Sequence, residues 1–240
     1  MLEETERAQI EAVDWSSLPG HPDRYEPDRA ARGLRALAEA ATPVQAAEAG
    51  SQLGGGGIVH AHSAAVFPAA VTAAPLLLDI VRRGHPAAKA TALELLDQAM
   101  SYHPHAGYTR VATPGGIAAP LCCAIAHQVR ARTASLVELG EKGGSLLDAA
   151  AAHWRFEIRE CAADGSDTAV YGRLSGRLPD GVRAAEMHVT DDITVLDELT
   201  LEYPPAEGSL EACLRVFARH PDELPPGAVL LPAECGHRVH

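Results

Sequence analysis

Histidine pairs are the residues of this sequence whose type and spacing suggest metal binding most directly. Two pairs have His-x-His spacing, His60 with His62 and His103 with His105. Imidazole nitrogens bind zinc and nickel, so the four rings could chelate one ion if the loops that carry them meet. The alternative is that each pair lies at a helix end, where a ring bonds a backbone group or faces solvent.

The end of the chain offers a second candidate metal site. Cys235, His237 and His240 place one thiol and two imidazoles within six residues, and His188 on an expected strand could supply a fourth ligand. Chain ends usually fray, which argues against a preformed site there. We therefore expect no bound cofactor, with zinc or nickel as the alternative.

Other chemical groupings have simpler explanations. Cys122 and Cys123 lie in a predicted helix near His127, but a nucleophile also needs an oriented base and an oxyanion donor, so we expect small buried cysteines. The adjacent Asp191 and Asp192 mark an expected turn, where carboxylates are usually solvated.

Glu157 and Glu160 are a further carboxylate pair, which we expect on an exposed strand face. Paired carboxylates perform acid-base catalysis only when a cleft holds them. We assign no catalytic residue, and the sequence favours a protein that is not an enzyme without excluding catalysis.

Composition limits the classes of partner. The 240 residues are 47% hydrophobic and 4% aromatic, which predicts a core of aliphatic side chains. The formal charge of -12 disfavours nucleic acid and anionic lipid and favours a basic protein partner. The five cysteines are odd in number and scattered, which is typical of free thiols in a reducing compartment.

The chain opens with charged residues, and none of its apolar runs approaches the ~20 residues that a membrane span needs. We therefore expect a cytoplasmic protein.

Hydrophobic periodicity predicts helices over most of residues 1–154. Apolar residues recur at helical spacing from residue 30, from residue 66 and from residue 88, with further helices after residues 117 and 145. Ser63 is a candidate cap for the second of these, and Pro75 predicts a kink in it. Short links between helices make antiparallel hairpins.

The pattern changes after Trp154. Residues 155–161 and 168–176 flank a turn at residues 164–167, and a similar pair surrounds residues 191–192, which predicts antiparallel strands. Residues 209–220 look like one helix. We expect a mainly α protein: a helical domain over residues 1–154 and a small α+β region with an antiparallel sheet over residues 155–240, with helix throughout as the competing interpretation.

Three segments resemble bacterial HEAT-like repeat proteins: residues 14–18, 34–41 and 62–71. His62, the Val-Phe-Pro-Ala segment from Val66 and the Ala-Pro-Leu-Leu segment from Ala74 sit at the places of the family's His-Gln-Gly, Val-Tyr-Pro-Ala and Ala-Val-Pro-Phe-Leu stretches, with Ser63 and Ala64 in place of Gln-Gly. The resemblance covers residues 14–100. It implies stacked helical hairpins whose curved face binds proteins, and it implies no catalytic residues.

Two functions remain in view. The first is a non-catalytic, immunity- or adaptor-like module that presents an acidic concave helical face to a basic protein. The second is a metal-binding protein or metal-dependent enzyme that uses the His-x-His pairs or the tail from Cys235. The oligomeric state is left open.

Overall fold

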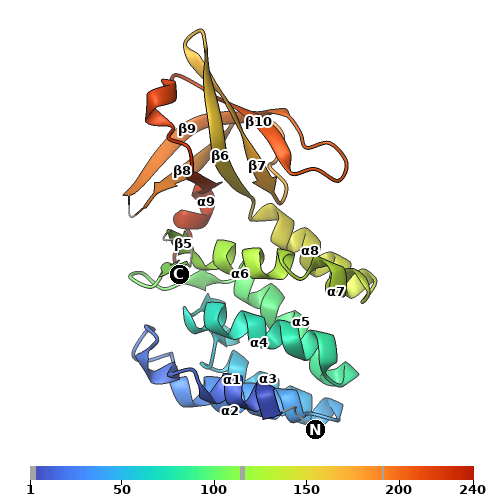
Figure 1. Cartoon of the computed structure of the whole chain (residues 1–240). Coiled ribbons are helices and arrows are strands. Elements are labelled where there is room, and N and C mark those ends of the chain that lie inside the picture. The colour runs from blue at the N-terminus through green and yellow to red at the C-terminus, as the bar shows by residue number, and fades with distance from the viewer. Residues whose placement is uncertain (1–3, 114–116, 191) are drawn as a thin grey trace.

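The computed structural model describes residues 4–113, 117–190 and 192–240. Layers of helices form one end of the molecule, and a closed β-barrel forms the other (Figure 1). The turn expected at residues 191–192 lies partly outside this described part, which does not include 191.

The helical end consists of helix pairs that follow one another along the chain. Three helices begin at a proline in their first turn, where the missing backbone donor costs nothing, and Thr42 caps one of them by accepting from the Gln45 amide at 3.2 Å. Their Ala and Leu stripes form one continuous core. The helices are α1 (Glu4–Glu11), α2 (Pro27–Glu39), α3 (Pro43–Gly54), α4 (Ala69–Arg83), α5 (Pro86–Ser101), α6 (Leu121–Arg130), α7 (Thr133–Val137) and α8 (Glu141–Ala152), with a 3-10 turn at Trp15–Ser17.

The segment before α4 differs from the prediction. Ser63 does not cap a helix: it ends a 3-10 turn (Ala61–Ser63), and α4 begins six residues later at Ala69. Ala64 adopts a left-handed backbone (φ 50°), and Pro68 precedes the helix, so the chain cannot run helically from Ser63. Short strands form instead: β1 (Val59–His60), β2 (Ala65–Val66) and, parallel to β2, β3 (His103–Pro104).

A small hairpin leads into α6. Strands β4 (Arg110–Ala112) and β5 (Ala118–Pro120) pair antiparallel, and α6 starts directly after Pro120. The helix that we expected from Ile117 therefore begins four residues later. This hairpin lies between the helical layers and the barrel (Figure 1).

Residues 155–232 form a closed antiparallel barrel with the strand order β10-β7-β6-β11-β8-β9. Alternate residues, among them Phe156, Leu174 and Leu230, fill its interior. The strands are β6 (Arg155–Asp164), β7 (Asp167–Ser175), β8 (Arg183–Val189), β9 (Asp192–Tyr203), β10 (Glu211–Val216) and β11 (Val229–Pro232).

The predicted fold class is therefore wrong. The molecule is 44% helix and 27% strand with a closed six-stranded barrel, rather than a mainly helical protein with a small sheet at its end. For the same reason, a helical HEAT-like repeat protein does not describe the whole chain. The four strands from residue 155 to residue 203 lie close to where alternation placed them, but alternation alone does not show that a sheet closes.

The predicted helix over residues 209–220 is also wrong. Leu210, Cys213, Leu214 and Phe217 have helical spacing, yet the segment forms β10. Ala212, Leu214 and Val216 point into the barrel core at a period of two, and β10 pairs with both β7 and β9. Burial against two neighbouring strands outweighs the helical pattern.

After β11 the chain returns to the helical layers through α9 (Ala233–Gly236), which lies between the barrel and the β4–β5 hairpin (Figure 1). The Arg238 guanidinium then donates to the carbonyl oxygens of Met100 and Ser101, and the His240 amide donates to the Pro104 carbonyl at 2.8 Å. The end of the chain is thus bound to the helical part.

In the part of the chain that the structure describes, no helix combines the length and the apolar character that a membrane crossing requires.

Candidate metal centre

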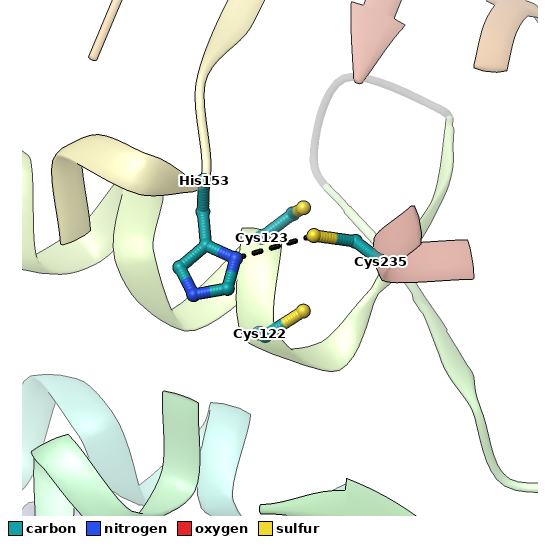
Figure 2. Close-up of side chains that lie close together, drawn as sticks. All are labelled: Cys122, Cys123, His153 and Cys235. Atoms are coloured by element: carbon teal, nitrogen blue, oxygen red, sulfur yellow. Dashed lines mark hydrogen bonds between the residues drawn. The ribbon is translucent and has the colours of Figure 1, made fainter. Parts of the chain in front are cut away.

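Four potential metal ligands converge where the helical layers meet the barrel: Cys122, Cys123, His153 and Cys235 (Figure 2). One ligand atom from each residue lies within 4.8 Å of those of the other three. The Nδ1 atom of His153 lies 3.3 Å from the Sγ atom of Cys235. Among residues 4–113, 117–190 and 192–240, these four are the one group of three or more His, Cys, Asp or Glu side chains whose ligand atoms lie this close together.

Three separate segments supply the four side chains. Cys122 and Cys123 lie in the first turn of α6, directly after the β4–β5 hairpin. His153 follows the last residue of α8 and leads into the barrel, whereas Cys235 lies in α9 after the final barrel strand. The cluster therefore joins a helix, the junction between the two halves and the returning end of the chain.

Arg130 fixes the backbone beside this cluster. Its Nη1 atom donates to the carbonyl oxygens of Ala150, at 2.5 Å, and His153, at 2.9 Å. Burial lowers the pKa of the Arg130 guanidinium to about 10, which leaves it charged at neutral pH. A positive charge thus lies beside the thiols and holds the end of α8 in place.

The three cysteines are 5%, 3% and 5% exposed in chain order, and apolar side chains including Ile117, Val229 and Leu231 surround them. Hydrogen bonds from the thiols of Cys123 and Cys235 hold the pKa of Cys122 well below its ordinary value. The hydrogen bond to Cys122, together with burial, raises the pKa of Cys123 and of Cys235. Within the cluster, the thiol that loses its proton most readily is therefore Cys122.

The spacing suits a tetrahedral ion. Zinc binds thiolates at ~2.3 Å and imidazoles at ~2.0–2.1 Å, which places the ligand atoms roughly 3.5–3.8 Å apart. The four ligand atoms lie within 4.8 Å of one another, which is close to these separations. Three sulfurs and one nitrogen form a Cys3His set, one of the common structural zinc sites.

The His-x-His pairs come close to each other without forming such a group. Pairing of β2 with β3 places both pairs at the same small sheet. The His105 ring lies 4.6 Å from that of His21 and 4.8 Å from that of His240, whereas the rings of His60 and His62 are 6.4 Å apart between centroids. His60 Nδ1 lies 2.7 Å from the Ser63 hydroxyl, and His240 Nε2 lies 2.5 Å from the Ser63 carbonyl.

Of the predicted metal ligands, the structure brings only Cys235 into the Cys3His cluster. His103 and His237 are exposed, on β3 and just after α9. His188, considered as a partner of the tail, is buried on β8 with its Nε2 atom 3.3 Å from a carboxylate oxygen of Glu186. Glu186 also accepts two hydrogen bonds from Arg110, at 2.9 and 2.5 Å.

Sequence reasoning missed three of the four residues of this cluster. Cys122 and Cys123 were interpreted as small buried residues, and His153 was not selected at all. Two signals were present in the sequence. Cys122 and Cys123 are adjacent and follow Pro120 closely, and His153 lies just before the predicted change from helix to strand.

The carboxylates considered for catalysis lie elsewhere. Glu157 faces Arg155, with 3.6 Å between Oε2 and Nη2, and Glu160 is exposed on β6. Asp192 begins β9 and is exposed, while Asp191 lies outside the described residues. The described side chains of this set are on the outer surface of the barrel.

No protein-family model matches the chain, and searches of the curated proteins and of the solved structures gave no match.

Proposed function

We propose that this chain is a zinc-binding protein in which Cys122, Cys123, His153 and Cys235 hold one structural ion. The observation that carries the proposal is the convergence of four ligand atoms from three distant segments within 4.8 Å of one another. Three thiols and an imidazole are the donors of a common structural zinc site, and here the thiols are buried and the imidazole is half-buried. The ion would join the helical layers to the barrel.

Donor chemistry selects zinc. Thiolate ligands favour zinc, copper(I) and iron-sulfur clusters over magnesium, calcium or manganese, and a tetrahedral set of three sulfurs and one nitrogen is typical of zinc. Four protein ligands leave no open coordination position for water or substrate. We therefore propose a structural role for the ion and none in catalysis.

Charge balance supports the same assignment. Three thiolates around a divalent ion leave a net charge of about -1, which is costly to bury alone. Arg130 supplies the opposite charge beside the cluster while its Nη1 atom holds the His153 carbonyl. This hydrogen bond holds the backbone of His153 in place at the end of α8.

The first test is the zinc content of untagged protein purified without chelator. We expect about one zinc per chain in the natural sequence and in Cys213→Ser, which removes a thiol that is equally buried but lies in the barrel strand β10. Cys235→Ser and Cys122→Ser should lose zinc. Zinc-free natural protein, or equal zinc in all four proteins, would overturn the proposal.

A second measurement avoids variants that fail to fold. In the zinc-loaded natural protein, a strong chelator should speed the reaction of three thiols with a thiol reagent, whereas Cys213, which is equally buried but outside the cluster, should react at an unchanged rate. Reactivity that is the same with and without chelator contradicts a zinc-thiolate site.

Binding to a basic protein is a second candidate function, and the distribution of charge favours it. Residues 155–240 carry sixteen acidic and eight basic side chains, whereas residues 1–154 carry sixteen and twelve. On β9, Asp197 and Glu198 are exposed, as are the apolar Ile193 and Val195. We therefore propose the outer face of β9, and not a concave helical face, as the surface for such a partner.

The test of this second candidate is the salt dependence of binding to whatever partner is identified. Affinity should fall as ionic strength rises and fall again in Asp197→Lys with Glu198→Lys. Binding that ignores both salt and the charge reversal rules out this surface.

A further inference from the structure

A cavity of about 590 Å³ lies between the helical layers and the outer face of the barrel. Elements from both halves form its walls: α4, the β4–β5 hairpin and α6 on one side, and β6, β7 and β11 on the other. Ligand sites in proteins typically occupy ~300–1,000 Å³ and often lie between domains. Both the size and the position of this cavity are those of a binding site.

The wall from the helical side is mainly apolar. Val71 and Pro75 of α4, Ile117 of the hairpin and Ala124 of α6 line it, and Leu231 of β11 adds a further aliphatic side chain from the barrel. A hydrocarbon body of a ligand would lose its contact with water here, which is the main source of affinity for apolar groups.

The barrel side contributes positive charge. Strand alternation points Phe156 and Leu174 into the barrel, so Arg155 and Arg173, each one residue away, point outward to the cavity. Arg130 lines the helical side. Glu157 is the acidic residue of the lining and lies 3.6 Å from Arg155, and Arg130 balances the charge of the proposed metal centre. This leaves Arg173 as the lining guanidinium with no opposite charge paired to it among the described residues.

Arg173 is available to a ligand. It is exposed, and within the described part of the chain it makes no ion pair. Two carboxylates lie opposite it in the sheet, and each is paired with another arginine: Glu211 with Arg159 at 2.7 Å and Glu157 with Arg155 at 3.6 Å. The positive charges of Arg155 and Arg130 add to burial in lowering the pKa of His127, another lining residue. This end of the cavity is electropositive in a protein of formal charge -12.

We propose that this cavity binds a small organic carboxylate with an apolar body, its anionic group against Arg173 and Arg155 and its hydrocarbon part against Val71, Pro75 and Ile117. Planar guanidinium groups match carboxylates in two-point hydrogen bonds. The proposal goes beyond the zinc site and does not depend on it, although Cys123 lies in the wall of the cavity as well.

Calorimetric titration with hexanoate, octanoate and decanoate, below micellar concentrations, tests the proposal. We expect one site per chain and an affinity that rises about fourfold for each added methylene that the cavity buries. Decanol and decyltrimethylammonium have the same tail without the negative charge, and both should bind at least about tenfold more weakly than decanoate.

Variants then locate the site. Arg173→Met should weaken decanoate binding about tenfold or more, since a hydrogen-bonded ion pair is lost. The matched control is Arg177→Met, because Arg177 is an exposed arginine that pairs with Asp148 outside the cavity. In the natural protein, decanoate should also raise the pKa of His127, measured by NMR, because a nearby negative charge favours the imidazolium.

Absence of binding, equal affinity for decanol, or equal weakening by both arginine variants would overturn the carboxylate site. Zinc is measured in the same samples. Failure of carboxylate binding in protein that carries its zinc refutes the cavity proposal alone, whereas zinc-free protein refutes the metal centre.

Discussion

Glu186 is 2% exposed, yet it carries a carboxylate at the junction of the barrel and the helical layers. Arg110 of the β4–β5 hairpin donates two hydrogen bonds to it, and His188 Nε2 lies within 3.3 Å. Gly236 of α9 packs so closely on this ion pair that a β-carbon there would collide with Glu186 Oε1. The pair, like the Cys3His cluster, thus connects α9 and the barrel to the segment around the β4–β5 hairpin.

Removing one partner of this pair leaves a buried charge uncompensated. We expect Arg110→Ala to lower the free energy of unfolding by about 3 kcal/mol, measured by denaturant titration. Arg177→Ala removes an arginine from the exposed pair with Asp148 and should change it by less than about 0.5 kcal/mol. Similar losses in the two variants would mean that the buried pair contributes no more than a surface one.

The pH dependence of stability reports on the same residue. Burial alone would raise the pKa of Glu186, but the adjacent His188 and the hydrogen bonds from Arg110 outweigh it and lower the pKa below the ordinary 4.5. Because the folded-state pKa is the lower one, this stabilisation is present above pH 4.5 and is lost as the pH falls below it. Glu186→Gln should therefore lose less of its stability than the natural protein as the pH falls from about 4.5 to about 3 in thermal melts. An identical loss contradicts the lowered pKa.

Candidate metal ligands could be predicted from the sequence only where several of them lie close together in one segment. Cys235 was a candidate because histidines follow it closely, but its actual neighbours are 82, 112 and 113 positions away in the sequence. The spacing of ligands within a segment carries no information about contacts that the fold creates between segments. The His-x-His pairs stood out for the opposite reason: their spacing is local.

At the scale of elements, β6 and β7 show how the barrel accommodates a large side chain. Gly172 of β7 pairs with Ile158 next to Phe156, and a β-carbon at Gly172 would collide with the Glu157 carbonyl and lie 2.8 Å from the Phe156 ring. Glycine at this position lets the ring lie across the strand, and Phe156 is completely buried.

Gly172→Ala should therefore lower the free energy of unfolding by about 1–3 kcal/mol through overpacking. The matched control is Gly144→Ala in α8. A β-carbon at Gly144 would meet no neighbouring group within 4 Å, so alanine there should be neutral or stabilise by up to ~1 kcal/mol. Thermal or urea unfolding measures both. A harmless Gly172→Ala would show that the strands can separate to admit a methyl group.

Prediction of elements succeeded where a pattern was long and failed where it was short. The amphipathic helices and the strands β6 to β9 have enough residues to reveal their period. β10 is six residues long, and its apolar residues fit both a helical and an alternating pattern. β11 has only four residues, follows a proline-rich stretch and ends at Pro232, so no period can be recognised in it.

For the whole molecule, closure of the barrel depends on β11. This strand pairs with β6 on one side and with β8 on the other, so a segment near the end of the chain completes the sheet. Pairing between segments so far apart in sequence is decided by packing and not by local pattern. Alternation therefore predicted strands in this region without predicting a barrel.

Zinc removal should act on the junction and not on the distant helices. After chelation, we expect faster hydrogen exchange in α9 and in the turns around Cys122 and His153, because these segments lose their shared ligand. Helices α2 and α3 pack at the other end of the helical layers and should exchange at an unchanged rate (Figure 1). Uniform acceleration would indicate global destabilisation, and no change would indicate that the cluster holds no ion.

X-ray absorption spectroscopy at the zinc edge of the purified, untagged protein tests the central claim most directly, because it counts and identifies the atoms bound to the ion. The proposed centre predicts three sulfur atoms at ~2.3 Å and one nitrogen at ~2.0–2.1 Å. A shell of nitrogen and oxygen atoms alone, as an ion bound by the neighbouring rings of His21, His105 and His240 would give, would contradict the Cys3His centre.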